Sequence, residues 1–365
     1  MCGLFGFSLT GANRVPDPAI AAGRHARDLL AHRGPDSAGE SVAAGTYLGH
    51  RRLAIIDLSE SGRQPMVSDD GDVAIAVNGE IYNYQGLRDA LGPERFRSQS
   101  DSEVVLHGYR VWGLDGLLDA LDGMYAVVIH DRAAGQVHLV RDRPGIKPLF
   151  YAVTGGICTW ASELKAIEAF AADGGPTGDA RLTTDETALY DFLTYGYVPA
   201  PKTRFREVRK LPPGCVATID TTDAALTVTR YWQLPAPPAT ALDGPGGDAE
   251  DAGQQLRTLV ERNVASQLVS DVPVGFFLSG GMDSTTVVAH AAPGRDARTY
   301  AIGWDVASHD ETGFAEMAAS AFATRHTTRK LSDDDSAGLL ERMVAWYDEP
   351  HADTSILPTY WVSHL

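Results

Sequence analysis

The stretch PAPPATALDGPGGDAEDAG at 235–253 divides the chain into two parts whose hydrophobic patterns differ. It is rich in Pro, Gly, Ala and Asp and has no hydrophobic period, which is typical of a linker or an exposed loop. Residues 1–160 contain short apolar runs separated by turns with Gly and Asp, and this pattern predicts β-strands. After residue 253 apolar strands alternate with helical patterns, which predicts a parallel α/β sheet.

The elements expected in the first part are mainly strands. They are predicted at 2–9, 46–58, 72–83, 124–132, 136–143 and 149–153, with helices near Asp17–Ala31 and Ser102–Trp112 and a hairpin at 216–232. In the second part, Leu256, Val260, Val264 and Leu268 recur every four residues and predict an amphipathic helix. The elements expected after it are a buried strand at 272–279, a helix at 285–292, a strand at 299–304, and helices around Gly313–Ala323 and Ser336–Trp346.

Composition narrows the class of protein. The formal net charge is −17, and no run of Lys or Arg offsets it locally, which argues against binding nucleic acid or an anionic membrane surface. Three scattered cysteines predict no disulfide framework and favour a reducing compartment. No stretch has the ~18 apolar residues of a membrane span. The N-terminal run lacks the cationic region of a signal peptide. We therefore expect a cytoplasmic protein.

The motif SGGMDS at 279–284 follows a strand pattern and begins a helix pattern. Backbone N–H groups of such a turn, together with the helix N-terminus, favour an anion. The motif resembles the pyrophosphate-binding loop of ATP pyrophosphatases, in which Asp283 would hold Mg²⁺, a cation that prefers oxygen ligands. A glycine-rich turn without a ligand is the alternative. AIGW at 301–304 is a second candidate for contact with the nucleotide, or a simple core strand.

The chain begins MCGLFGF, with a cysteine directly behind the start methionine. Cys2 could be a buried thiol, and the run could be a first β-strand. Alternatively, removal of Met1 makes Cys2 an N-terminal nucleophile whose own α-amine, titrating near pH ~8, serves as its base. The stretch alone does not decide between these interpretations.

Four polar stretches of the first part supply what such a nucleophile needs. They are RGPDSAG at 33–39, RRLAIIDL at 51–58, NGEIYNY at 78–84 and SDSE at 100–103. Taken singly, each could be a turn, a cap or a surface charge. Together they offer Asn78 and Gly79 as oxyanion donors, Arg52 as a bidentate partner for an α-carboxylate, and Glu80 and Asp101 for an α-ammonium. A substrate with both charged groups and an attackable amide is glutamine.

These motifs, in this order, resemble those of glutamine-hydrolysing asparagine synthetases. MCGLFG, RGPD, NGEIYN, SDSE, RDRPGIKPLFYA at 141–152 and SELKAI at 162–167 resemble the N-terminal-nucleophile glutaminase domain of that family. SDVPVGFFLSGGMDS and DEPHADTSILPTY resemble its adenylating synthetase domain. The resemblance implies an α+β glutaminase domain of sandwiched antiparallel sheets at 1–215, the hairpin and linker at 216–253, and the first part of an α/β parallel-sheet ATP-pyrophosphatase domain at 254–365.

The resemblance also implies a reaction. Cys2 attacks the amide of glutamine, glutamate leaves through a thioester, and ammonia travels to an aspartyl-adenylate made from ATP and aspartate. The implied catalytic residues are Cys2, Asn78 and Gly79. The implied glutamine-binding residues are Arg52, Leu53, Ala54, Ile55, Ile56, Asn78, Gly79, Glu80 and Asp101. The implied ATP-binding residues are Leu278, Ser279, Gly280, Gly281, Asp283, Ser284 and Ile302, with Asp283 also the Mg²⁺ ligand. Family members commonly form homodimers.

The resemblance leaves three points open. A further acidic loop of the family lies about twenty residues beyond DEPHADTSILPTYWVSHL, and the sequence ends at Leu365 before it. We therefore expect an intact glutaminase part and an incomplete synthetase part, from either a truncated gene product or a fragment. An amidotransferase of specialised metabolism that acts on another carboxylate is one alternative. Glutaminase activity alone is the other.

Overall fold

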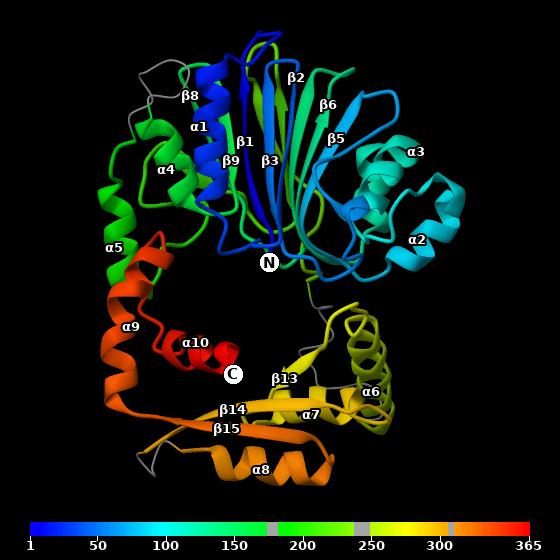
Figure 1. The fold of residues 1–365 in the computed structure, drawn as a ribbon, viewed down its shortest axis with the longest axis vertical. Coiled ribbons are helices and arrows are strands. Elements are labelled where there is room, and N and C mark those ends of the chain that lie inside the picture. Colours follow the sequence, from blue (N-terminus) through cyan, green and yellow to red (C-terminus); the bar gives the residue numbers. More distant parts are fainter. Residues whose placement is uncertain (174–181, 237–248, 306–309) are drawn as a thin grey trace. The chain divides into compact units, whose positions relative to one another are not determined.

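The computed structural model describes residues 1–173, 182–236, 249–305 and 310–365, so most of the predicted linker lies outside the described residues (Figure 1). The described chain divides into two compact units. The first comprises Met1–Leu234 and Asp348–His351, and the second comprises Pro235–Tyr347 and Ala352–Leu365. The domain boundary that we place at residue 215 stays a prediction. The hairpin after it pairs with a strand of the first unit.

The first unit contains two six-stranded sheets in which every neighbouring pair of strands is antiparallel. The first sheet has the order β10 (Val208–Lys210), β8 (Phe150–Thr154), β9 (Ile157–Ala161), β1 (Gly3–Leu9), β3 (Thr46–Arg52) and β2 (Ser37–Ala43). The second has the order β12 (Leu226–Arg230), β11 (Cys215–Asp220), β7 (Gln136–Arg141), β6 (Gly123–Asp131), β5 (Val73–Ile81) and β4 (Met66–Val67).

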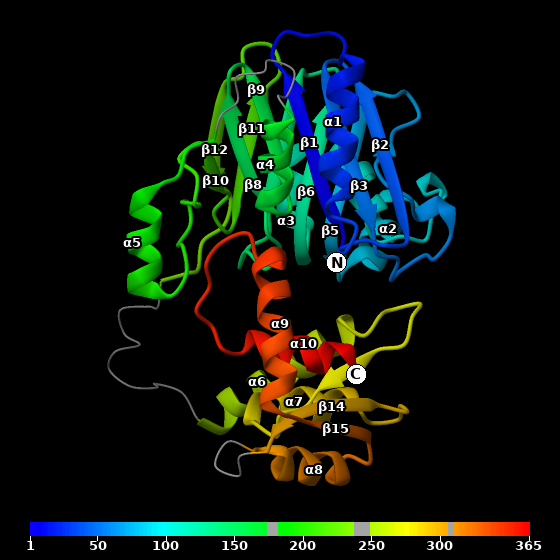
Figure 2. The same cartoon turned by 60° about the vertical axis from the view of Figure 1, so that its left-hand side comes forward.

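Helices cover the outer faces of both sheets (Figures 1 and 2). The helices α1 (Asp17–Asp28) and α4 (Leu164–Ala172) pack on the first sheet, while α2 (Tyr84–Leu91) and α3 (Glu103–Ala120) lie on the second. Strand residues alternate between layers, as the period of two requires. Ala74 and Ala76 pack between the sheets, whereas Ile75 and Val77 pack under α3. The expected sandwich of antiparallel sheets is confirmed.

The boundaries of several elements differ from the predictions. The strand predicted at 46–58 ends at Arg52, because the following residues form a loop in which Asp57 has a positive φ of 61°. The helix predicted to end at Trp112 resumes after a break at Gly113 and continues to Ala120. In the first unit, sequence patterns also missed the helices α2, α4 and α5 (Glu186–Tyr195) and the strands β2, β4, β9 and β10, which are too brief or too polar to show a clear period.

The second unit contains a three-stranded parallel sheet, as expected, in the order β13 (Gly275–Phe277), β14 (Arg298–Trp304) and β15 (Arg325–Leu331). Its helices are α6 (Ala249–Ser266), α7 (Met282–Ala291), α8 (Thr312–Ala321), α9 (Asp333–Trp346) and α10 (Ile356–His364). The buried strand predicted at 272–279 is shorter and more exposed than expected. Its extended part is Gly275–Phe277, and Phe277 is 57% exposed. Among the described residues, β13 is an edge strand that pairs only with β14.

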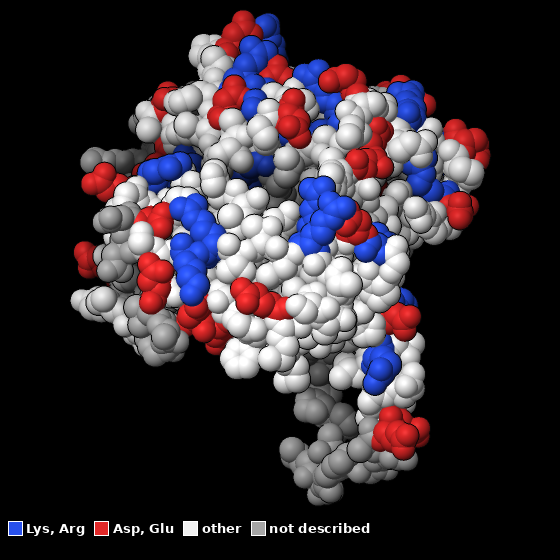
Figure 3. Space-filling view, turned by 60° about the horizontal axis from the view of Figure 1, so that its bottom comes forward, with Lys and Arg blue, Asp and Glu red and all other residues white. Residues whose placement is uncertain are grey.

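No helix among the described residues is long and apolar enough to cross a membrane. On the face drawn in Figure 3, basic side chains lie among acidic ones and form no continuous basic surface.

The aromatic stack under α4 allows a test of the first sheet. Phe7 is fully buried and stacks on Phe170 and Tyr47 at centroid distances of 4.6 and 5.5 Å. We expect Phe7→Ala to lower the free energy of unfolding of the first unit by about 3–5 kcal/mol, because it leaves a cavity in a packed core. Val153→Ala on β8, where the side chain is 39% exposed, is the control and should change it by about 0.5 kcal/mol or less. Equal effects in chemical denaturation would contradict this account of the core.

Candidate functional site

Strand pairing delivers Cys2 to one end of the first sheet. Gly3 at the start of β1 pairs with Arg51 near the end of β3, so Cys2 lies beside the residues that follow β3. The backbone N–H of Leu53 donates to Cys2 Sγ at 3.5 Å. The carbonyl of Cys2 accepts from Arg33 Nε at 2.9 Å, and Arg33 Nη1 in turn bonds Glu163 Oε1 at 2.9 Å. Cys2 is therefore held at its thiol by Leu53 and at its carbonyl by Arg33.

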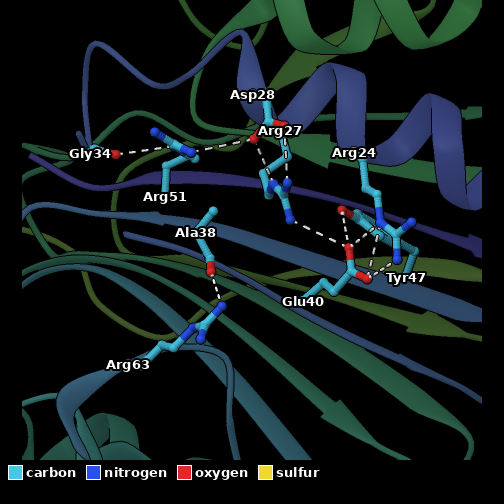
Figure 4. Close-up of polar contacts among 9 residues, drawn as sticks. All are labelled: Arg24, Arg27, Asp28, Gly34, Ala38, Glu40, Tyr47, Arg51 and Arg63. Carbon is cyan, nitrogen blue, oxygen red and sulfur yellow. Dashed lines mark hydrogen bonds and ion pairs between the residues drawn. The ribbon is translucent and has the colours of Figure 1, made fainter. Parts of the chain in front are cut away.

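The motif RGPD forms the turn that carries Arg33. Gly34 lies so close to β3 that a Cβ there would be 2.3 Å from the carbonyl of Arg51, so only glycine fits. Arg51 Nε donates to the Gly34 carbonyl at 3.1 Å and its guanidinium pairs with Asp28 at 3.5 Å (Figure 4). Asp36 Oδ2 accepts from Ala54 N at 2.8 Å. Sequence reasoning assigned no residue of this motif to the site, whereas the motif anchors both the nucleophile and the loop beside it.

A pocket lies next to the thiol. Its lining residues come from three of the four polar stretches (51–58, 78–84 and 100–103), from the start of the chain, and from Gln64 and Val77. They are Cys2, Arg52, Leu53, Ile55, Ile56, Gln64, Val77, Gly79, Glu80, Ser100, Asp101 and Ser102. Most residues predicted to bind glutamine are thus brought together. Ala54 and Asn78 are not in this lining, and Asn78 is fully buried on β5 next to the lining residue Gly79.

The Arg52 guanidinium is held in place by the loop that follows β3. It donates to the carbonyls of Ser59 at 2.9 Å and Ile56 at 3.2 Å, and also to that of Asp57. A guanidinium has five N–H groups, so about two remain for a ligand. Its side chain is 6% exposed, which makes those donors strong partners for a carboxylate.

Asn78 carries an unsatisfied amide. It is fully buried, and within the described parts of the chain neither its Nδ2 nor its Oδ1 has a hydrogen-bond partner. Such orphaned groups are rare in folded proteins and destabilise them unless a ligand or water pairs with them. At the neighbouring Gly79 a Cβ would lie 2.1 Å from the carbonyl of Met124, so no side chain can intrude there. Asn78 is therefore suited to donate to an oxyanion formed at the thiol.

Two carboxyl groups share the pocket at a high electrostatic cost. Burial, and then the neighbouring Asp101, raise the pKa of Glu80 to about 8. Burial also raises the pKa of Asp101, although its Oδ2 accepts from Ile81 N at 2.8 Å. A bound cation relieves this repulsion, so the pair favours a ligand with an ammonium group.

Burial also shifts the nucleophile and the terminal amine. It raises the pKa of the Cys2 thiol, so the neutral thiol is favoured and a base is needed to activate it. It lowers the pKa of the terminal ammonium that Met1 carries in this chain, so burial favours the neutral form of that amine.

Asp57 is a site residue that sequence reasoning missed. Its Oδ1 accepts from the N–H of Ser59 at 3.0 Å, and its Oδ2 from the N–H of Gln99 at 2.8 Å and the hydroxyl of Ser61 at 3.0 Å. Burial opposes its charge, but these hydrogen bonds lower the pKa of Asp57 to about 2. The carboxylate ties the Arg52 loop to the segment before Asp101. The spacing D-x-S-x-S, typical of an Asx turn, was the available signal.

In the second unit, the predicted nucleotide loop connects β13 to α7. Ser279 Oγ lies 3.0 Å from Ser284 Oγ, and the N–H of Gly281 donates to Ser279 Oγ at 3.3 Å. Gly280 has a φ of +80°, and a Cβ there would be 2.5 Å from Ala315 N and from Phe314. The loop is therefore fixed by glycine at the start of a helix, where backbone amides favour an anion.

The remaining predicted nucleotide residues differ in exposure. Asp283 is exposed in the first turn of α7, Ile302 is half-buried on β14, and Leu278 is buried. Leu278 serves the core of the unit, and its N–H bonds the Tyr300 carbonyl. In the described part of the chain, no three or more His, Cys, Asp or Glu residues form a metal cluster. One exposed carboxylate fits Mg²⁺ when phosphate oxygens supply most of its ligands.

Comparisons with known proteins match the two units to two different families. Residues 1–232 match the family model of the glutamine amidotransferase domain, and residues 255–365 match that of asparagine synthase. A provisionally named glutamine-hydrolysing asparagine synthetase of Mycobacterium tuberculosis is 34% identical over 379 residues, which cover 100% of this chain and 57% of that protein. A provisionally named counterpart from Methanocaldococcus jannaschii is 32% identical, covering 100% of this chain and 72% of its own length.

Asparagine synthetase [glutamine-hydrolyzing] 1 of Bacillus subtilis is 31% identical, covering 92% of this chain and 51% of that protein. The chain thus spans about half the length of several curated relatives it matches.

The carboxylate of Asp57 makes stability depend on pH. Its folded pKa lies below the unfolded value of ~3.9, so it stabilises the fold above about pH 4 and loses this effect as pH falls toward 2. We expect Asp57→Asn to lower the free energy of unfolding at pH 7 by about 1 to 2 kcal/mol, and the difference from the parent to shrink toward pH 2. Denaturation at several pH values measures this. Asp89→Asn, on the exposed face of α2, should change stability little at any pH. A pH-independent effect at Asp57 would contradict the assignment.

Proposed function

Because the chain belongs to the family of glutamine-hydrolysing asparagine synthetases, we propose that it hydrolyses glutamine at Cys2 and transfers the ammonia to an aspartyl-adenylate. The observation that carries the proposal is the convergence of a nucleophile, a buried guanidinium and two carboxyl groups on one pocket, with the unpaired amide of Asn78 next to the lining residue Gly79. This set is complementary to glutamine, with its side-chain amide, α-carboxylate and α-ammonium. The loop SGGMDS supports the adenylating half.

Glutamine recognition in this proposal uses the charges of the pocket. The two N–H groups of Arg52 that the loop leaves unused bind the α-carboxylate. The α-ammonium lies between Glu80 and Asp101, whose mutual repulsion it relieves. Binding is then coupled to ionisation, since the ammonium lowers the raised pKa of Glu80. A substrate without the α-ammonium would leave the carboxyl pair uncompensated.

Hydrolysis begins after Met1 is removed and Cys2 carries the terminal amine. The thiol sulfur attacks the amide carbon of glutamine, while the terminal amine takes the thiol proton. Asn78 Nδ2 donates to the oxyanion that forms. The amine returns the proton to the leaving nitrogen, the C–N bond breaks, and ammonia and a thioester result. Water then attacks the thioester, and glutamate leaves with the thiol restored.

The second unit is proposed to bind ATP at the loop between β13 and α7. The Ser279 and Ser284 hydroxyls and the amides at the start of α7 face the phosphates, and Ile302 lies at the next strand. Mg²⁺ held by Asp283 would supply charge neutralisation for the leaving pyrophosphate. Aspartate is the proposed acceptor, on the strength of the relatives' names.

One reaction tests the whole proposal. The chain is incubated with glutamine, aspartate and Mg-ATP, and the amino acids, AMP and pyrophosphate are measured by mass spectrometry. Asparagine formed together with equal AMP supports the full reaction. Glutamate without asparagine or AMP supports the first unit and contradicts the proposed acceptor reaction of this chain. No glutamate from a chain shown to start at Cys2 contradicts the proposal.

We expect Cys2→Ala to reduce glutamate release by about a thousandfold or more, because no thioester can form. Asn78→Ala should reduce kcat by about 10²–10³-fold with a smaller change in KM, because its amide acts mainly on the oxyanion. Cys158→Ala changes a buried thiol of the same unit outside the pocket and serves as the control. A Cys2→Ala variant with parental activity would exclude the assigned nucleophile.

We expect Asp283→Asn to reduce AMP and pyrophosphate formation by at least about tenfold, because a ligand of Mg²⁺ is lost, while glutamate release without ATP stays at the parental rate. The exposed Asp296→Asn, outside the loop, is the matched control. If Asp283→Asn forms AMP at the parental rate, Asp283 is not a ligand in the adenylating site.

A further inference from the structure

The residue before Asn78 has an unusual set of hydrogen-bond partners. The short strand β4 pairs with β5 only at Ala74 and Ile75, so it does not reach Val77. Two buried side chains bond the peptide groups of Val77 instead. Gln64 Oε1 accepts from Val77 N at 2.6 Å, and His50 Nε2 lies 3.0 Å from Val77 O. His50 is fully buried, and burial lowers its pKa to about 4, so the neutral ring donates to that carbonyl.

Gln64 also reaches the opposite side of the pocket. Its Nε2 donates to Ser102 Oγ at 3.2 Å, and the Ser102 hydroxyl donates to Asp101 Oδ1 at 3.4 Å. Gln64 is 3% exposed and lines the pocket beside Cys2. One continuous chain of hydrogen bonds therefore runs from Val77 through Gln64 and Ser102 to Asp101. It joins the strand that carries Asn78 and Gly79 to the carboxylate proposed to bind the α-ammonium.

We propose that Gln64 is a positioning residue that sets the oxyanion donors and the ammonium-binding carboxylate at the separation that glutamine requires. The inference rests on the proposed function and deepens it. Gln64 is not itself a catalytic residue, since its amide is engaged by Val77 and Ser102. It acts through the strand on one side and through Asp101 on the other, so both turnover and binding of the α-ammonium depend on it.

The chain of hydrogen bonds requires an amide side chain at position 64. One end must accept from a backbone N–H and the other must donate to a hydroxyl, and a primary amide presents both groups in one plane. An ionised carboxylate keeps the acceptor but loses the donor. It would also add a third carboxyl group beside Glu80 and Asp101, where burial and then the neighbouring Asp101 already raise the pKa of Glu80. A protonated carboxyl group restores the donor.

Gln64→Glu therefore provides a test with a signature in pH. We expect kcat/KM for glutamate release to be about 10- to 100-fold below the parent at pH 8, and the ratio to approach one as pH falls and the buried carboxyl group protonates. Gln64→Met, of similar length, should be impaired at every pH. The other titratable or charged groups around the pocket are shared by both proteins: Cys2, the terminal amine, Arg33, His50, Arg52, Glu80, Asp101 and Lys147. The ratio of the variant's kcat/KM to that of the parent therefore reports the ionisation of residue 64.

Two controls separate this role from a general loss of structure. Gln85→Glu makes the same change on the exposed face of α2 and should leave the ratio near one at every pH. Thermal unfolding should be cooperative in all variants. If Gln64→Met unfolds, Ser102→Ala provides a second test. It interrupts the same series of hydrogen bonds between Gln64 and Asp101 and should raise KM for glutamine.

The outcomes distinguish this inference from the function on which it rests. A parent chain starting at Cys2 that releases no glutamate would overturn the proposed function and this inference with it. An active parent whose Gln64→Glu variant matches it at pH 8, or is impaired equally at all pH values, would overturn the inference alone. A ratio that recovers at low pH only for Gln64→Glu supports it.

Discussion

The antiparallel pairing of β1 with β3 is the constraint on which the first site depends. Because Gly3 pairs with Arg51, the start of β1 and the end of β3 meet at the same end of the sheet. Cys2 is then placed next to Leu53, and the loop after β3 becomes a wall of the pocket. A slip of one residue would turn every side chain of β1 to the other face and separate the thiol from this wall. The packing of Leu4 between the sheets and of Phe5 under the helices opposes such a slip.

The pocket keeps several polar groups in states that are unfavourable without a ligand. The amide of Asn78 has no hydrogen-bond partner among the described residues, and burial together with the neighbouring Asp101 raises the pKa of Glu80 to about 8. These costs persist because the surrounding framework is rigid: Asp57 ties the Arg52 loop to the segment before Asp101, and Gln64 ties that segment to β5. Free energy stored in this way favours a ligand that satisfies all of these groups together.

Much of this arrangement could be predicted from the sequence. Alternation and turn residues located β1, β5 and β6, and the motifs named the groups that line the pocket. The parts that could not be predicted are long-range contacts without a local signal. Gln64 stands in a loop with no periodic pattern, and its partners Val77 and Ser102 are 13 and 38 residues away. The edge position of β13 was also missed, because an apolar run does not show how many neighbours a strand has.

The two proposed sites solve the problem of binding anions in different ways. The net charge of −17 disfavours any anion at long range, so both need local donors. The first unit buries the guanidinium of Arg52 and fixes it on three carbonyls, which suits a planar carboxylate. The second unit uses the turn before α7, which Gly280 allows to pack against Phe314 and Ala315. Backbone amides at a helix start suit a phosphate with several oxygens, and they need no lysine.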